Sequence, residues 1–312
     1  MNIKTRMLLS SILMLILLSG CASSNVVIEP THNPATAVPA TQTANPTMTP
    51  TLVPSRTPLA GVLVLPLDTL DNQIPWLPME NVERPGTYMF IFNTKKPPFN
   101  NVSVRKALIA AIDRETLVTI TEKYGTTNAS PATSLTPPQT MARDLYNQIG
   151  IPFDIDQAKA YLADAGYTDP SKFPPATILI NVAGEAAPGL HVQITDAMIK
   201  MWKDHLGITV TSEVVEWGAY QERLQTNPPE IVRLSWAADY NDPDNFLKEL
   251  FYTNSSYNYG HFSNLEFDQL VDQAADNADP AERQVLYMQA EQILCEIEAA
   301  ILPIYHATWN MP

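Results

Sequence analysis

Three closely spaced aspartates form the part of the chain with the clearest capacity for chemistry. Asp239, Asp242 and Asp244 lie within one short stretch, and clustered carboxylates are the ligands that hard cations such as Ca²⁺ prefer. The glycine and the closing glutamate that complete a calcium loop are absent here. Asparagine, proline and aspartate in the same stretch favour a turn. We therefore expect an acidic loop and no metal.

The remaining sequence carries none of the short motifs that indicate catalysis. G-x-S-x-G, H-E-x-x-H, C-x-x-C, G-x-x-x-x-G-K-[ST] and G-x-G-x-x-G are all missing, and the five histidines lie far apart. Each of these motifs positions a nucleophile, a metal or a phosphate. His205 falls near the end of an expected helix, where a capping role fits better than metal ligation. The sequence thus predicts no enzyme activity and no cofactor.

Cys21 is the residue whose surroundings indicate a covalent modification. Lys4 and Arg6 precede an apolar run over residues 7–18 that is too short to span a bilayer, which is typical of a secretory signal. Leu18-Ser19-Gly20-Cys21 then resembles the bacterial lipobox. We expect residues 1–20 to be a lipoprotein signal peptide and Cys21 to carry the lipid. The alternative is ordinary secretion with an incidental cysteine.

Composition separates a linker from a globular body. Residues 21–60 are dominated by Thr, Pro and Ala and cannot bury enough apolar surface to fold, so a semi-rigid stalk is expected. Residues 61–312 form the expected body. The net charge of −14 argues against nucleic acid as a partner. Cys295 remains as the second cysteine, and we interpret it as a small buried hydrophobe rather than a reactive thiol.

Strand-like runs alternate with helical spacing along the body. Expected strands cover residues 88–92, 177–182, 208–215 and 231–236. Expected helices cover residues 104–112, 158–165 and 194–206. Asp113 is placed to cap a following helix, and the helix over 158–165 is expected to start near Asp156. This alternation predicts an α/β fold with a β-α-β unit and a right-handed crossover.

Helix ends are marked by specific residue types. Gly166 and Gly207 follow the ends of two expected helices, and the missing Cβ of Gly166 suits the left-handed conformation found after a helix C-terminus. Asp279 is expected as an N-cap, with Pro280 at the first helical position and Glu282 completing a capping box.

Four blocks of the sequence resemble, in the same order, the extracellular solute-binding proteins of peptide and nickel transporters, known as family 5. The blocks cover residues 92–114, 163–167, 236–243 and 279–306. The resemblance implies the periplasmic-binding-protein-like fold of type II, with a mixed sheet and flanking helices, in which two lobes close on a ligand. Complete members are longer and place their first lobe ahead of the first block. We therefore expect 61–312 to be a partial family 5 domain with that lobe largely missing.

The resemblance also implies three ligand-binding residues. Asp239 matches the aspartate that pairs with the α-amino group of a bound peptide, although it could instead cap or close the turn. Trp236 matches a tryptophan of the cleft wall, with a core position as the alternative. Arg233 matches an arginine that meets the peptide carboxylate, and surface pairing with a glutamate is the alternative.

Taken with the signal peptide, these features predict a lipid-anchored, extracytoplasmic component of a peptide-type ABC importer. It would capture oligopeptides or related solutes for a membrane permease without catalysing a reaction. The alternative is a one-lobed remnant that acts as a surface interaction protein without solute capture. In either case the surface that normally packs on the missing lobe would be exposed, so self-association or binding of a partner chain is expected.

Overall fold

The computed structural model describes residues 82–124, 128–140, 148–182 and 188–311. The chain divides into two units, Met1–Pro66 and Leu67–Pro312, and the described residues belong to the second. The predicted signal peptide, the predicted lipidation site Cys21 and the expected stalk over 21–60 lie outside the described residues. Within the described part, no helix combines the length and apolar character needed to cross a membrane.

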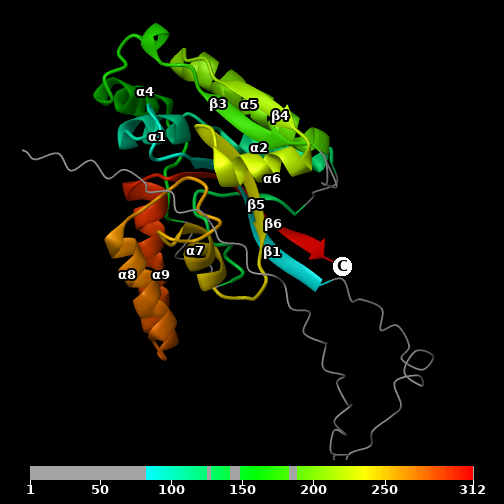
Figure 1. The fold of residues 1–312 in the computed structure, drawn as a ribbon, viewed down its shortest axis with the longest axis vertical. Helices are drawn as coiled ribbons and strands as arrows, with labels where there is room; N and C mark the ends of the chain where they lie inside the picture. Colours follow the sequence, from blue (N-terminus) through cyan, green and yellow to red (C-terminus); the bar gives the residue numbers. More distant parts are fainter. Residues whose placement is uncertain (1–81, 125–127, 141–147, 183–187, 312) are drawn as a thin grey trace, which may run out of the picture. The chain divides into compact units, whose positions relative to one another are not determined.

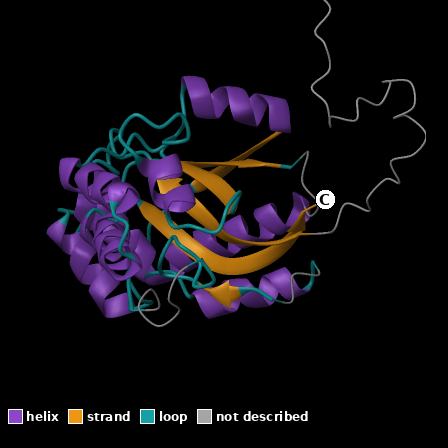
Figure 2. Ribbon diagram, turned by 90° about the horizontal axis from the view of Figure 1, so that it is seen from below, coloured by secondary structure: helices purple, strands orange, loops and turns teal. Residues whose placement is uncertain are grey.

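One mixed sheet organises the described residues. Its strand order is β2-β6-β1-β5-β3-β4, and helices cover both of its faces (Figures 1 and 2). The strands are β1 (Val82–Phe92), β2 (Ser130–Pro131), β3 (Thr177–Asn181), β4 (Thr211–Val215), β5 (Ile231–Ala237) and β6 (Ile301–Met311). β3 runs parallel to β4 and β5, whereas β1 runs antiparallel to β5 and β6. The predicted α/β class and the parallel β-α-β pair are confirmed.

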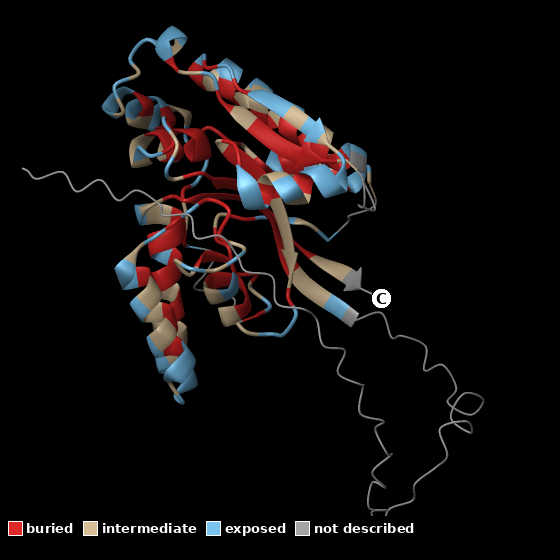
Figure 3. Cartoon of the chain, viewed as in Figure 1, coloured by how far each residue is buried: buried red, intermediate tan, exposed pale blue. Residues whose placement is uncertain are grey.

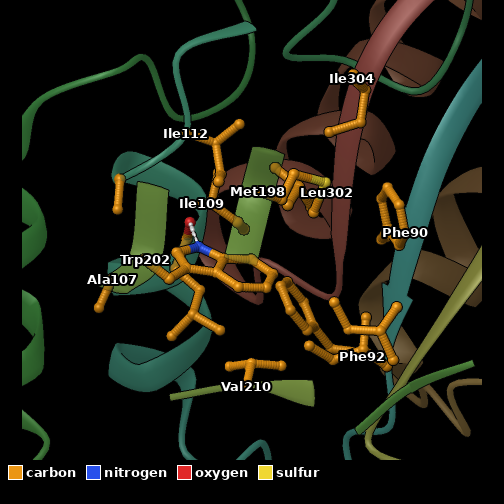
Figure 4. Packing of buried hydrophobic residues seen from close by; sticks show 14 of the residues in the cluster. Phe90, Phe92, Ala107, Ile109, Ile112, Met198, Trp202, Val210, Leu302 and Ile304 are labelled. Atoms are coloured by element: carbon orange, nitrogen blue, oxygen red, sulfur yellow. Dashed lines mark hydrogen bonds between the residues drawn. The ribbon is translucent and has the colours of Figure 1, made fainter. Parts of the chain in front are cut away.

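The first face of the sheet packs against α1 (Val102–Ala110), α2 (Arg114–Glu122), α4 (Ile155–Asp164) and α5 (Pro188–Leu206). Alternation along β1 directs Tyr88, Phe90 and Phe92 into this core, where Trp202 of α5 is fully buried. The Trp202 Nε1–H group donates to the Leu108 carbonyl oxygen at 2.8 Å (Figure 4). This bond satisfies the polar atom of the indole within an apolar core.

The second face packs against α6 (Trp217–Thr226), α7 (Asp244–Phe251), α8 (Leu265–Asp276), α9 (Pro280–Gln292) and the π-helical turn Ile293–Ile297. Met89 and Ile91 of β1 meet Phe246 and Tyr287 in this core. Cys295 is 1% exposed here, so the predicted buried position is confirmed. Buried residues concentrate in the sheet and on the inner faces of the helices (Figure 3).

The start of α9 differs in part from the expected capping box. The Asp279 side chain accepts from the backbone N–H groups of Ala281 and Glu282 at 2.8 and 3.2 Å, as predicted. The expected return bond from Glu282 is wrong, because the Asp279 N–H donates to Asn277 Oδ1 at 2.8 Å. The Asn277 amide donates to Glu282 Oε2 instead. Asn277 is closer to Asp279 in sequence than Glu282 is, and its side-chain oxygen accepts the Asp279 N–H in place of Glu282.

The ends of α4 and α5 follow the expected pattern. α4 begins at Ile155, which agrees with the expected start near Asp156, and it is capped by Asp154, which accepts from the Gln157 N–H at 2.9 Å. Gly166 and Gly207 have φ values of +92° and +72°. Gly166 thus adopts the predicted left-handed conformation, and Gly207 adopts it as well.

β6 is a strand that the hydrophobic pattern did not reveal. Pro303 interrupts its run, and proline cannot donate to a sheet ladder. The register with β1 shifts at this point, so that Tyr305 pairs with Tyr88 and Pro303 pairs with Met89. Ile304 lies between these pairs, and its carbonyl accepts from Ala132 on the other side at 3.0 Å. The irregularity accommodates proline inside a central strand.

Candidate functional site

The three residues expected to bind ligand lie along β5 and in the loop after it. Successive side chains of a strand point to opposite faces, so Arg233 and Trp236 face opposite sides of the sheet. Arg233 contacts His191 of α5, whereas Trp236 packs beside Leu234 in the second core. The structure therefore brings Trp236 and Asp239 onto one side of the site and places Arg233 across the sheet.

Asp239 lies where the β1–β5 pairing ends. Gly86 pairs with Ala237, and the next residue, Ala238, donates its N–H to the Pro85 carbonyl at 2.9 Å. This register brings Arg84 of β1 to Asp239, with Arg84 Nη1 at 3.3 Å from Asp239 Oδ1. The Asp239 side chain is 63% exposed, so its carboxylate is accessible to a ligand.

The expected alternatives for Asp239 do not describe its side chain. Asp242 closes the local turn, because its Oδ1 accepts from the Asp244 N–H at 3.0 Å. The Asp239 carboxylate instead makes the long-range contact with Arg84. An exposed carboxylate held by one cross-strand cation is a reasonable acceptor for a ligand ammonium group.

Trp236 and Asp239 share one hydrogen-bond acceptor. The Oδ1 atom of Asn245 accepts from Trp236 Nε1 and from the Asp239 backbone N–H, each at 3.0 Å. Asn245 is 1% exposed, and Trp236 is half-buried. The Trp236 ring packs edge-on against Tyr257 with centroids 5.1 Å apart. Sequence reasoning did not identify Asn245, although its position in the first turn of α7 suits a side chain that bonds backbone groups.

Arg233 is enclosed by aromatic and imidazole groups. It is 2% exposed, so the surface position considered from the sequence is wrong. Its Nη2 atom lies 2.5 Å from His191 Nε2, and the guanidinium lies 5.1 Å from the Tyr88 ring centroid. Because arginine only donates, His191 Nε2 accepts, and its Nδ1–H group faces the Tyr88 hydroxyl at 3.1 Å. Tyr305 stacks on Tyr88 with centroids 4.9 Å apart.

His191 was not identified from the sequence, although a signal was available. It precedes Ile194, Met198 and Trp202 at intervals of three and four residues, so it belongs to the buried stripe of α5. A histidine on such a stripe needs a polar partner inside the core. Only the packing of α5 on β5 shows that this partner is Arg233.

A polar cavity of about 450 Å³ lies on the second face, lined by Ser130, Pro131, Ala132, Thr133, Ser134, Pro138 and His306. His306 Nδ1 lies 2.9 Å from Thr87 Oγ1, and the Thr87 hydroxyl donates to the Leu135 carbonyl at 2.5 Å. Thr87 Oγ1 therefore accepts from His306 Nδ1–H, leaving Nε2 to accept from Ser134 Oγ at 3.4 Å. Burial lowers the pKa of His306 to about 3, so this imidazole is neutral at physiological pH.

His306, which lines this cavity, lies on the same face of the sheet as Trp236. Thr87 of β1 pairs with Trp236 of β5 on one side and with His306 of β6 on the other. Paired residues of neighbouring strands point to the same face. Trp236, Thr87 and His306 thus form a row across three strands, and no local pattern in the sequence indicates it.

Glu291 of α9 fixes one wall of the cavity. Its carboxylate is fully buried and accepts from the Leu135 and Thr136 backbone N–H groups and from the Thr136 hydroxyl. Burial raises the pKa of Glu291, and the bonds from Thr136 oppose that shift. The side chain is therefore a structural anchor for the 135–136 turn.

The acidic loop shows no arrangement for a metal. Among the described residues, no group of three His, Cys, Asp or Glu side chains could hold an ion. Asp242 pairs with Arg283 at 2.9 Å, and Asp244 accepts from the Tyr240 hydroxyl at 3.0 Å. His205 donates from Nδ1 to the Ala111 carbonyl at 2.8 Å, so it bonds the C-terminal end of α1 rather than that of its own helix, α5.

Comparison with known proteins identifies close relatives over most of this region. The family model for bacterial extracellular solute-binding proteins, family 5 Middle, matches residues 36–258. The periplasmic oligopeptide-binding protein OppA of Salmonella typhimurium is 34% identical over 226 residues, which cover 70% of this chain and 39% of OppA. The probable deoxycholate-binding periplasmic protein YgiS of Escherichia coli is 33% identical over 231 residues, covering 72% of this chain and 41% of YgiS.

A solved structure shows the same likeness. The periplasmic murein tripeptide binding protein MppA, in its unliganded open form, superposes with a TM-score of 0.59 and 32% sequence identity. The match covers 77% of this chain and 45% of the MppA chain. This chain thus spans about two fifths of the length of the curated relatives it matches.

Proposed function

Because this chain belongs to the bacterial extracellular solute-binding proteins, family 5, we propose that it captures peptide-like solutes outside the cytoplasmic membrane for an ABC importer. The described fold is the predicted α/β lobe of the periplasmic-binding-protein-like architecture. The observation that carries the proposal is the exposed Asp239 carboxylate, joined through Asn245 to the aromatic ring of Trp236.

The proposed ligand is a short peptide or a similar molecule with a free amine. Asp239 would accept the ammonium group, because a charge-assisted hydrogen bond compensates for partial desolvation. Trp236 would present a flat apolar surface to a side chain of variable shape. Peptides are the ligand class named for OppA and MppA, and a permease would receive them from this protein.

Arg233 and His191 would recognise the ligand's carboxylate in this proposal. A guanidinium offers a fork of donors that matches a carboxylate. Since Arg233 is 2% exposed, binding there requires local opening between α5 and β5. The role proposed for Arg233 can therefore be tested independently of the role proposed for Asp239, because the Asp239 carboxylate is accessible without rearrangement.

Binding without turnover fits the chemistry of the described residues. Within the described part of the chain, the Ser134 hydroxyl lies 3.4 Å from His306 Nε2, yet Thr87, not a carboxylate, contacts the other ring nitrogen. A general base works best with a pKa near the operating pH, and that of His306 is about 3. The relatives OppA and YgiS are likewise binding proteins by name.

The function is tested by titrating Ala-Phe-Ala and N-acetyl-Ala-Phe-Ala into the purified chain and following saturation-transfer NMR. We expect Asp239→Asn to weaken binding of the free-amine peptide by up to about 1 kcal/mol, the range for an exposed ion pair. Asp204→Asn is the matched control, because its carboxylate is also exposed and paired, with Lys200 of α5. Absence of saturation transfer to either peptide would favour the interaction-protein alternative.

Lipid anchoring at Cys21 is a second part of the proposal. It is supported by the lipobox and by the Pro/Thr-rich segment that follows, since two or three acyl chains make a stable anchor. Cys21→Ser is expected to move the protein from the detergent phase to the aqueous phase in Triton X-114 separation. A wild-type protein that partitions into the aqueous phase would refute the anchor and leave the binding proposal intact.

A further inference from the structure

The Arg84–Asp239 pair is built by strand register. The two residues are 155 positions apart and are brought together where β1 and β5 end their pairing. One contact joins them, from Arg84 Nη1 to Asp239 Oδ1 at 3.3 Å. Their side chains are 33% and 63% exposed, so both can rotate away into solvent.

The backbones beneath this pair are fixed. Ala238 donates its N–H to the Pro85 carbonyl at 2.9 Å, and Asp239 donates its N–H to Asn245 Oδ1 at 3.0 Å. Any change at the pair therefore falls on the two side chains. A cation that arrives at the Asp239 carboxylate meets Arg84 already beside it.

The neighbouring ion pair between Asp242 and Arg283 is held in place by further hydrogen bonds. Arg283 also donates from Nε to the Ala274 carbonyl at 2.9 Å and from Nη2 to the Tyr287 hydroxyl at 3.2 Å. Among the described residues, the Arg84 guanidinium has its hydrogen bond to Asp239 and no second one. Arg84 is therefore held by Asp239 itself, and it is displaced at the cost of one exposed ion pair.

We propose that Arg84 is an internal competitor that occupies the Asp239 carboxylate in the ligand-free chain and is displaced by the ammonium group of a ligand. This inference rests on the proposed function. A ligand with a free amine must replace the Arg84 contact, whereas a ligand with a blocked amine leaves it in place. Arg84 thus sets how strongly the chain distinguishes free from blocked amino termini.

The experiment compares Arg84→Gln with wild type in titrations of Ala-Phe-Ala and N-acetyl-Ala-Phe-Ala, followed by NMR on the full chain. Because an exposed pair is weak, we expect Arg84→Gln to bind the free-amine peptide about 1.5- to 5-fold more tightly. Affinity for the acetylated peptide should not change. The gain should disappear in 1 M NaCl, where the Debye length is about 3 Å.

Two control variants separate the possible causes. Arg84→Lys keeps the charge and should remain close to wild type. Arg223→Gln removes an arginine of similar exposure from an ion pair with Glu213, and it should leave both affinities unchanged. A gain in Arg223→Gln equal to that in Arg84→Gln would show a general charge effect and overturn the proposal.

The remaining outcomes distinguish this inference from the function beneath it. Equal or weaker binding of Ala-Phe-Ala by Arg84→Gln, with binding by wild type intact, overturns the competitor role and leaves the binding function standing. Equal gains for both peptides overturn it as well, because the acetylated peptide has no ammonium group. Failure of both proteins to bind either peptide overturns the proposed function together with the inference.

Discussion

At the scale of single residues, a chain of hydrogen bonds links the buried polar side chains around His306. His306 donates to Thr87, which donates to the Leu135 carbonyl, while Ser134 faces the second ring nitrogen. This arrangement suits a neutral imidazole, because a charged ring would carry a second proton toward Ser134 in a buried site. Protonation of His306 must therefore compete with folding.

His306 makes stability depend on pH. Its pKa is lowered to about 3 in the folded chain against about 6.5 unfolded, so the unfolded chain binds more protons between these values. Stability is then fully present above pH 6.5 and falls by about 1.4 kcal/mol per unit as pH drops toward 3. We expect His306→Asn, which cannot titrate, to lose this slope in urea denaturation at pH 7, 6 and 5.

The comparison with the variant is needed because Glu291 acts in the opposite direction. Its raised pKa means that the folded chain binds the proton more tightly, so its contribution grows as pH falls. Both proteins contain Glu291, and its effect cancels in the difference. If the free energy of unfolding changed with pH in the same way in wild type and in His306→Asn, the lowered pKa assigned to His306 would be wrong.

At the scale of elements, helix ends are decided by short-range chemistry. Asp113 caps α2 by accepting from the Thr116 hydroxyl at 2.6 Å and from its N–H at 3.4 Å. Gly166 and Gly207 follow α4 and α5 with positive φ, where an L-residue with a Cβ is disfavoured. Gly218 instead lies within the first turn of α6, and a Cβ there would meet open space.

Substitution of these glycines by alanine is expected to change the free energy of unfolding in opposite directions after a helix and within one. Gly166→Ala is expected to lower the free energy of unfolding by about 1 kcal/mol through backbone strain alone, because its Cβ would contact nothing. Gly207→Ala should cost at least as much, since its Cβ would lie 3.3 Å from Pro170 Cβ. Gly218→Ala should stabilise by up to about 1 kcal/mol through helix propensity.

Urea denaturation of the three variants at pH 7 measures these differences. The direction of the stability change in Gly218→Ala is the most decisive result, because a lower free energy of unfolding would show that the Gly218 backbone is not helical in solution. Unchanged stability of Gly166→Ala would contradict the left-handed cap of α4.

At the scale of the whole molecule, one sheet separates the two halves of the proposed peptide site. Asp239, Trp236 and the polar cavity beside His306 lie on the side of α7 and α9, whereas Arg233 lies with His191 beneath α5. Tight solute sites enclose most of the ligand surface. The Asp239 side chain is 63% exposed, so its contact with a ligand would remain open to solvent.

This geometry predicts weak binding by the chain. An exposed ion pair contributes about 0 to 1 kcal/mol, so we expect Ala-Phe-Ala to bind no more tightly than roughly millimolar, which corresponds to about 4 kcal/mol. Titration calorimetry with light scattering checks the affinity and the oligomeric state together. Micromolar binding by a monomer would show that the chain builds an enclosed site by itself.

The amino-acid sequence by itself determined the features that depend on neighbours within a few residues. The α/β alternation, the caps at Asp113 and Asp279, and the left-handed Gly166 follow from local spacing and residue type. The family blocks added the fold and the candidates Asp239, Trp236 and Arg233. The sequence did not reveal β6, because Pro303 breaks the alternation that marks a strand.

The tertiary structure alone decided what each candidate contacts. Arg84 meets Asp239 because the β1–β5 register aligns two strands far apart in the chain. His191 meets Arg233 because α5 packs on β5, and no local pattern encodes that crossing. The face toward which a strand side chain points changes with a one-residue shift in register. Long-range pairing therefore separates Arg233 from Trp236 and gives Asp239 its competing cation.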